Sequence, residues 1–177
     1  MALLAKILSK ASEPSPELDA IVAVAATESA GFGHNYIGTE HVLCALVQTS
    51  DAGLIRIFRL FGLRLANLRE SVLSVAKGRP HHASGVVRPR TPRLRHILQL
   101  ASDNLRAGKR LTPSQSLLLG ILQEGNGVAI RALSSLSVNL ARMRQELETA
   151  NQLPDPTSPS VTPPAGAGGA PSVAADH

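Results

Sequence analysis

The chain contains an internal repeat, and this repeat restricts the possible folds more than any other feature of the sequence. From residue 33 onward, a shift of 75 positions places Gly33 on Gly108 and Leu43 on Leu118. The helix before that point needs a shift of 76. One residue is therefore missing from the second copy, near its first loop. The shift of 75 holds from residue 33 to residue 69, where Arg69 falls on Arg144. A register kept over this length predicts two copies of one structural unit.

Each copy contains four stretches in which apolar residues recur at helical spacing. Hydrophobic residues make up 44% of the chain but aromatic residues only 2%, so the core must be aliphatic, which favours close-packed helices. We expect an all-α fold in which two pseudo-symmetric four-helix repeats pack as one bundle. The predicted helices span 16–30, 40–48, 52–61 and 65–77 in the first copy, and 92–106, 114–123, 127–136 and 140–150 in the second.

Composition divides the chain further. We expect an N-terminal leader at 1–14, a first repeat at 15–77, a linker at 78–90, a second repeat at 91–150 and a disordered tail at 151–177. The linker is rich in glycine, proline and basic residues, and the tail has too few large apolar residues to offset the entropy of ordering it. No segment is long and apolar enough to span a bilayer, and the single cysteine, Cys44, lies in an apolar run. We therefore expect a soluble, cytoplasmic protein in which Cys44 is a core residue.

The motif GHNYIGTEH at 33–41 brings two histidines and a glutamate together, as reaction centres and metal sites often do. The repeat supplies an internal control, because the second copy reads GKRLTPSQS at 108–116 and lacks all three side chains. A glycine, a small hydroxyl residue (Thr39 or Ser114) and an apolar helix remain in both copies. The role shared by the copies is therefore to turn the chain and to start a helix.

Helix-capping chemistry explains both versions of this motif. Thr112-Pro113-Ser114-Gln115 is typical of a capping box with proline at the first helical position. In the first copy, Thr39 is the expected cap, and Glu40 in the first turn suits the helix dipole.

A metal site is a weaker interpretation of the same motif. His34, Glu40 and His41 have no evident fourth ligand, and the HxxxH spacing of a helical metal pair is absent. No paired carboxylates, Ser/His/Asp arrangement or cofactor loop stands out. We expect no metal, no cofactor and no enzymatic activity.

The duplicated unit carrying GHNYIGTEHVLCALV, followed by a second copy that opens with TPRLRHILQLA, resembles the Clp N-terminal repeat domain. That domain caps Hsp100 chaperone-unfoldases such as ClpA and ClpC, and the resemblance covers about residues 15–150. It implies a protein-binding module that recognises substrates, adaptors or phosphoarginine tags for a Clp ATPase. The chain contains no GxxxxGK[ST] phosphate loop. The chain is therefore expected to be either a stand-alone module or an excised piece of a longer protein, and we favour a stand-alone module that delivers substrates to an ATPase or competes with it.

In ClpC-type members of this family, the glutamate of each GTEH motif helps to bind phosphorylated arginine. The resemblance therefore implies a ligand site at Thr39 and Glu40, and a second site at Gln115, where glutamine replaces the glutamate. A neutral glutamine does not supply the charge that a guanidinium pairs with. Pro14 and Arg90 stand where many ClpC-like members have an aromatic residue, which puts an aromatic peptide-binding groove in doubt.

The alternative function is anion or nucleic-acid binding, because the chain has a net charge of +5. Its basic residues gather in and after the linker, at Arg79, Arg88, Arg90, Arg93 and Arg95, with Lys109 and Arg110 further on. No aromatic residues are interleaved for base stacking, so a solvated charge run is favoured. We expect the partners to be a Clp ATPase or its substrates and adaptors, with no nucleic acid and no membrane. The sequence leaves the oligomeric state open.

Overall fold

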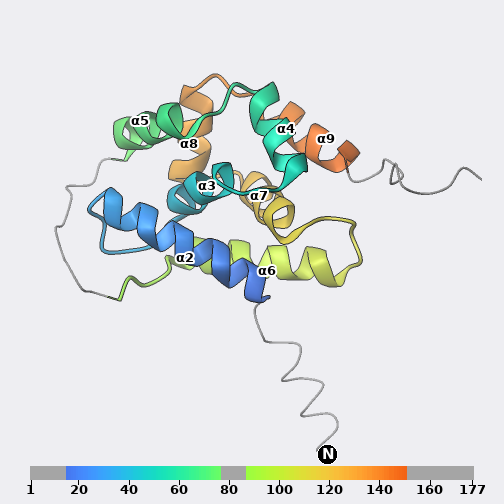
Figure 1. Cartoon of the computed structure of the whole chain (residues 1–177), viewed down its shortest axis with the longest axis horizontal. Helices are drawn as coiled ribbons and strands as arrows, with labels where there is room; N and C mark the ends of the chain where they lie inside the picture. The colour runs from blue at the N-terminus through green and yellow to red at the C-terminus, as the bar shows by residue number, and fades with distance from the viewer. Residues whose placement is uncertain (1–14, 77–86, 151–177) are drawn as a thin grey trace, which may run out of the picture.

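The fold is known from a computed structural model that describes residues 15–76 and 87–150 (Figure 1). The expected leader at 1–14, most of the linker and the tail at 151–177 lie outside these residues. The described residues form eight helices. The first copy contains α2 (Pro16–Gly31), α3 (Thr39–Val47), α4 (Ala52–Leu60) and α5 (Leu65–Val75), and the second contains α6 (Pro92–Arg106), α7 (Pro113–Glu124), α8 (Val128–Ser135) and α9 (Leu140–Ala150).

The two copies follow one another closely in secondary structure. Adding 75 to the bounds of α5 gives those of α9, and α2 and α6 both begin with a proline in the first turn. The residue missing from the second copy is lost at the end of the first helix, since α2 has 16 residues and α6 has 15. The chain then turns at Gly33 and at Gly108, each with a φ of 71° that favours glycine.

The helices of the two copies pack in pairs that are exchanged between the copies, as a pseudo-twofold arrangement requires. Helix α4 packs against α9, and the equivalent pair is α8 against α5. Likewise α3 packs against α8, and α7 packs against α4. The copies therefore share one core, and the predicted all-α fold of two related four-helix repeats is confirmed.

The central helices of this core are α3 and α7, which are apolar over most of their circumference. Residues 42–46 and 117–121 are buried without exception. Cys44 is fully buried within the first run, and burial raises the pKa of its thiol to about 12. Leu119 takes the equivalent place in the second copy. Cys44 is thus a small core residue, as its apolar setting predicts. Among the described residues, no helix is both long and apolar enough to cross a bilayer.

A short contact between the copies positions the motif at 33–41. The backbone N–H of Ile37 donates to the carbonyl of Pro89 at 2.9 Å, and the N–H of Thr91 donates to the carbonyl of Ile37 at 3.0 Å. Arg88 adds a hydrogen bond from Nε to the carbonyl of His34 at 2.9 Å. These bonds hold the start of α6 beside the start of α3, although the two lie far apart in the sequence.

Candidate functional site: a pocket at three helix starts

The start of α3 differs from the prediction at Thr39. The residue preceding the helix is Gly38, whose backbone is extended, and Thr39 is the first helical residue rather than its cap. The imidazole of His41 does the capping instead, because its Nδ1 accepts the backbone N–H of Gly38 at 2.8 Å. In the second copy the predicted capping box is present: Thr112 accepts from the N–H of Gln115, whose side chain accepts from the N–H of Thr112.

His41 is held in one neutral tautomer by its two hydrogen bonds. Its Nδ1 is an acceptor, so in the neutral ring the proton lies on Nε2, which faces Nδ1 of His34 at 2.8 Å. His41 is fully buried, and this burial, with smaller contributions from His34 and Arg88, lowers its pKa to about 3. His41 is therefore uncharged at neutral pH, and it donates to His34.

The three polar side chains of the motif lie close enough to be considered as metal ligands. His34, Glu40 and His41 are all buried, and each has a ligand atom within 4.8 Å of the others. However, metal binding through Nε2 of His41 would place the ring proton on Nδ1, which already faces the N–H of Gly38. The hydrogen-bonded pair of histidines therefore accounts for the cluster without a metal ion.

Glu40 is the member of this cluster whose hydrogen bonding is incomplete. It lies in the first turn of α3 and is only 3% exposed, and its Oε1 has no hydrogen-bond partner. The carboxylate folds back over Gly38, where a Cβ atom would collide with it. Its charge also acts on Tyr36, whose pKa rises to about 12, chiefly through burial and secondly through Glu40. A buried carboxylate oxygen without a partner is costly unless a ligand completes its hydrogen bonding.

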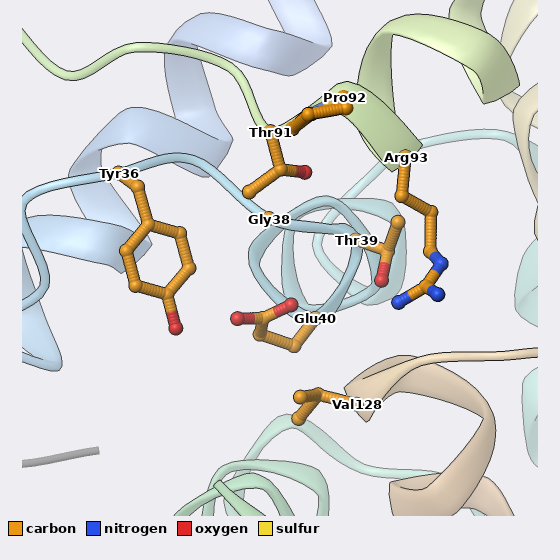
Figure 2. A pocket seen from close by; sticks show the side chains of 8 residues that line it. All are labelled: Tyr36, Gly38, Thr39, Glu40, Thr91, Pro92, Arg93 and Val128. Carbon is orange, nitrogen blue, oxygen red and sulfur yellow. The ribbon is translucent and has the colours of Figure 1, made fainter.

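Glu40 borders a cavity of about 340 Å³ that we call the Glu40 pocket (Figure 2). The pocket is built where three helices start, because its lining comes from the first residues of α3, α6 and α8. The unpaired N–H groups and dipoles of helix starts favour anions. The lining residues are Tyr36, Gly38, Thr39, Glu40, Thr91, Pro92, Arg93 and Val128.

Arg93 supplies positive charge at the side of the pocket that α6 forms. Its Nε donates to Glu124 at 2.9 Å, and its side chain packs over Gly127, where an added Cβ would lie 3.0 Å from Nη1. Gly127 has a φ of 98°, so both conformation and space call for glycine there. Sequence reasoning placed Arg93 only in a general basic cluster. The backbone contact between Ile37 and Thr91, which the sequence does not reveal, brings Arg93 into the pocket that Glu40 borders.

Gln115 does not lie in this pocket. Its side-chain amide is occupied by one residue from each copy, since Oε1 accepts from the N–H of Thr112 in the second copy and Nε2 donates to Asp51 of the first at 3.1 Å. Asp51 also accepts from the hydroxyl of Thr112 and from the N–H of Leu54. We call Asp51, Thr112 and Gln115 the Asp51 cluster. The structure therefore brings Thr39 and Glu40 together and places Gln115 elsewhere.

Several arginines of the predicted basic cluster are used within the protein. Arg90 pairs with Asp19 at 2.8 Å, and Arg93 pairs with Glu124. Arg95 donates to the carbonyl of Arg90, and Arg79 lies outside the described residues. The positive charge available for an extended polyanion is thus smaller than the sequence alone indicates.

These features define a duplicated helical domain with a charged pocket where three helices start, and comparison with known proteins shows the family to which it belongs. The family model of the Clp repeat (R) N-terminal domain matches residues 13–112. A Bacillus subtilis protein described as the negative regulator of genetic competence ClpC/MecB is 34% identical over 128 residues, which are 72% of this chain and 16% of that protein. The chaperone protein ClpB of Oceanobacillus iheyensis is 32% identical over 131 residues, with the same shares. The chain belongs to the Clp repeat N-terminal domain family.

A solved structure agrees with this assignment at the level of the fold. The N-terminal domain of ClpD from Arabidopsis thaliana superimposes with a TM-score of 0.61 over 77% of this chain and 95% of that one, at 16% identity. The chain spans about one sixth of the length of the curated relatives named above. What it matches is their N-domain, a non-catalytic protein-binding module of Clp chaperones.

Proposed function

We propose that the Glu40 pocket binds arginine side chains that carry a phosphate group, and that the protein recognises marked substrates or adaptors of a Clp system through them. The observation that carries this proposal is the unpartnered, buried Oε1 of Glu40 in a cavity that also contains Arg93. The ligand must bring a hydrogen-bond donor to the carboxylate and an anionic group to the arginine. A phosphorylated guanidinium combines both in one side chain.

The donor half of the ligand is selected by Glu40. A carboxylate accepts two parallel N–H bonds from a guanidinium, and such charge-assisted bonds are stronger than neutral ones. The low exposure of Glu40 strengthens the interaction further, because little water competes for the carboxylate. A neutral ligand without N–H donors would leave Oε1 unpaired.

The anionic half is selected by the surroundings of Arg93. Thr91 precedes α6, Arg93 lies in its first turn, and Val128 is the first residue of α8. Phosphate oxygens are strong acceptors that suit both an arginine side chain and the free N–H groups of helix starts. Glu124 restrains Arg93 without covering it, since the arginine side chain remains 46% exposed.

The protein would act by holding its partner rather than by changing it chemically. We propose that it delivers tagged substrates to a Clp ATPase or competes with the ATPase for them, in the cytoplasm. Pull-down with a Clp ATPase, with and without phosphoarginine as competitor, tests the partnership. Capture of the ATPase or of phosphoarginine-bearing proteins supports it, and the absence of both removes it.

The direct test is a calorimetric titration of the full chain with free phosphoarginine. We expect saturable binding that Glu40→Gln weakens by about tenfold to a hundredfold, the equivalent of losing one hydrogen bond to a charged group. Glu148→Gln is the matched control, because Glu148 is a half-exposed carboxylate on α9. Arginine alone and phosphate alone should each bind more weakly than the combined group. Equal affinity of wild type and Glu40→Gln would contradict the proposal.

A further inference from the structure

We propose that the protein has a single ligand site, because the Asp51 cluster closes the counterpart of the Glu40 pocket in the second copy. This inference rests on the proposed function of the Glu40 pocket and concerns how many ligands one chain holds. Its basis is a difference between equivalent positions of two otherwise similar repeats.

The first part of the difference is hydrogen bonding. Glu40 has an unpartnered oxygen, whereas the equivalent Gln115 uses both ends of its amide, one on Thr112 and one on Asp51. The amide of Gln115 also lies over Gly53, where an added Cβ would come within 2.5 Å of Nε2. Gly53 corresponds to Val128, which lines the Glu40 pocket. The counterparts of Glu40 and Val128, which both border the open Glu40 pocket, are therefore in contact with one another.

The second part of the difference is charge. The position equivalent to Arg93 is Glu17, and the position equivalent to Asn126 is Asp51. The Glu40 pocket is lined by one carboxylate, Glu40, and one guanidinium, Arg93, whereas the repeat puts Glu17 at the position of Arg93, and Asp51 is bonded to the neutral Gln115. An anionic group would meet repulsion there, and a guanidinium would have to displace Thr112 and Gln115 from Asp51.

Asp51 is held in place by the helix that it starts. Its side chain accepts the N–H of Leu54 at 2.9 Å, so it caps α4 while it receives Thr112 and Gln115. A ligand at this position would therefore compete with a helix cap and with a capping box in the same event. Neither cost applies at Glu40, whose own helix is capped by His41.

Calorimetry of the full chain with phosphoarginine measures the number of sites. We expect one ligand per chain for the wild type, and for Glu40→Gln only the weakened binding described above, with no second, tighter site. A stoichiometry of two overturns the single-site inference and leaves the proposed function standing. No binding to the wild type overturns the proposed function, and the inference falls with it.

A variant designed to gain a second ligand site tests whether the Asp51 cluster is the reason for the single site. The triple variant Glu17→Arg, Asp51→Asn, Gln115→Glu copies the charges of the first site onto the second, and we expect two ligands per chain. Adding Glu40→Gln to it should leave one. A folded triple variant, judged by helical circular dichroism and cooperative unfolding, that still binds one ligand overturns the role of the Asp51 cluster.

The nuclear magnetic resonance signals of the Gln115 side-chain amide give a second measurement that needs no stable variant. In the wild type saturated with phosphoarginine, these signals should keep their free-state positions, since Gln115 stays on Asp51. Signals of Gln115 that move in step with ligand occupancy overturn the inference.

Discussion

The two copies of this domain differ much less in their cores than at the start of their central helices. Leu43 and Leu118 are equivalent and fully buried, and the helices around them pack in exchanged pairs. At the equivalent positions Glu40 and Gln115, the start of α3 borders an open, charged pocket, whereas the start of α7 forms the Asp51 cluster. The comparison teaches that a repeat can keep its packing while only one copy keeps the chemistry of a site.

The largest expected effect tests the equivalence of the two cores. Leu43→Ala and Leu118→Ala should each lower the free energy of unfolding by about 2–5 kcal/mol, because each removes a fully buried side chain and leaves a cavity. Since the two copies share one core, urea unfolding should remain a single transition in both variants. Two separate transitions would show that the copies unfold independently and would contradict the claim that they share one core.

The next effect concerns acid sensitivity, which the histidine pair confers on the first copy alone. The pKa of His41 is lowered from its usual 6.5 to about 3, so the unfolded chain binds a proton more readily than the folded one between these values. The contribution of neutral His41 to the free energy of unfolding is fully present above about pH 6.5. It is lost as the pH falls towards 3, by up to about 1.4 kcal/mol per pH unit.

The variant His41→Ser isolates this contribution, because Ser116 occupies the equivalent position and donates to the carbonyl of Ala101 at 2.8 Å. Urea unfolding at pH 7 and pH 4.5 should show a smaller acid loss in the variant than in the wild type. Glu28, whose pKa is lowered chiefly by its bond to Arg69, adds to the acid loss in both proteins. An unchanged loss in the variant would contradict the neutral state of His41.

The smallest of these effects compares two arginines at equivalent positions. Arg69 binds the buried carboxylate of Glu28 through two hydrogen bonds of 3.0 and 2.6 Å, whereas Arg144 pairs with the exposed Glu148 on its own helix. We expect Arg69→Ala to cost about 1–2 kcal/mol, because the carboxylate loses charge-assisted bonds. Arg144→Ala should cost no more than about 0.5 kcal/mol. Thermal unfolding at matched salt concentration measures the stability of both variants. Equal losses of stability would contradict the predicted difference between the two arginines.

Local patterns predicted the helices well, because their signals lie within each helix. Proline at 16 and 92 marks the starts of α2 and α6, and apolar spacing predicted every later helix within two residues of its observed bounds. The capping box at Thr112 was equally local, since both of its partners lie within one turn. The role predicted for Thr39 was wrong because a side chain three residues after Gly38 caps the helix instead.

The site itself was only half predictable. The motif pointed to Glu40, but its place in one pocket with Arg93 depends on the backbone contact between Ile37 and Thr91, which no local pattern contains. The closure of the equivalent site at the start of α7 depends on a hydrogen bond between Asp51 and Gln115, which are 64 residues apart. Alignment of the repeat indicated that Gln115 lacks charge, whereas only the fold shows what it binds.

The most direct test of the account is a nitrogen–proton correlation spectrum of the full chain, recorded while phosphoarginine is added. The account predicts that the shifted amides cluster at residues 36–41, at 91 and 93, and at 127–128, while those around Asp51 and Gln115 stay in place. Equal shifts around both helix starts, or shifts confined to the second, would contradict the claim that only the first copy binds a ligand.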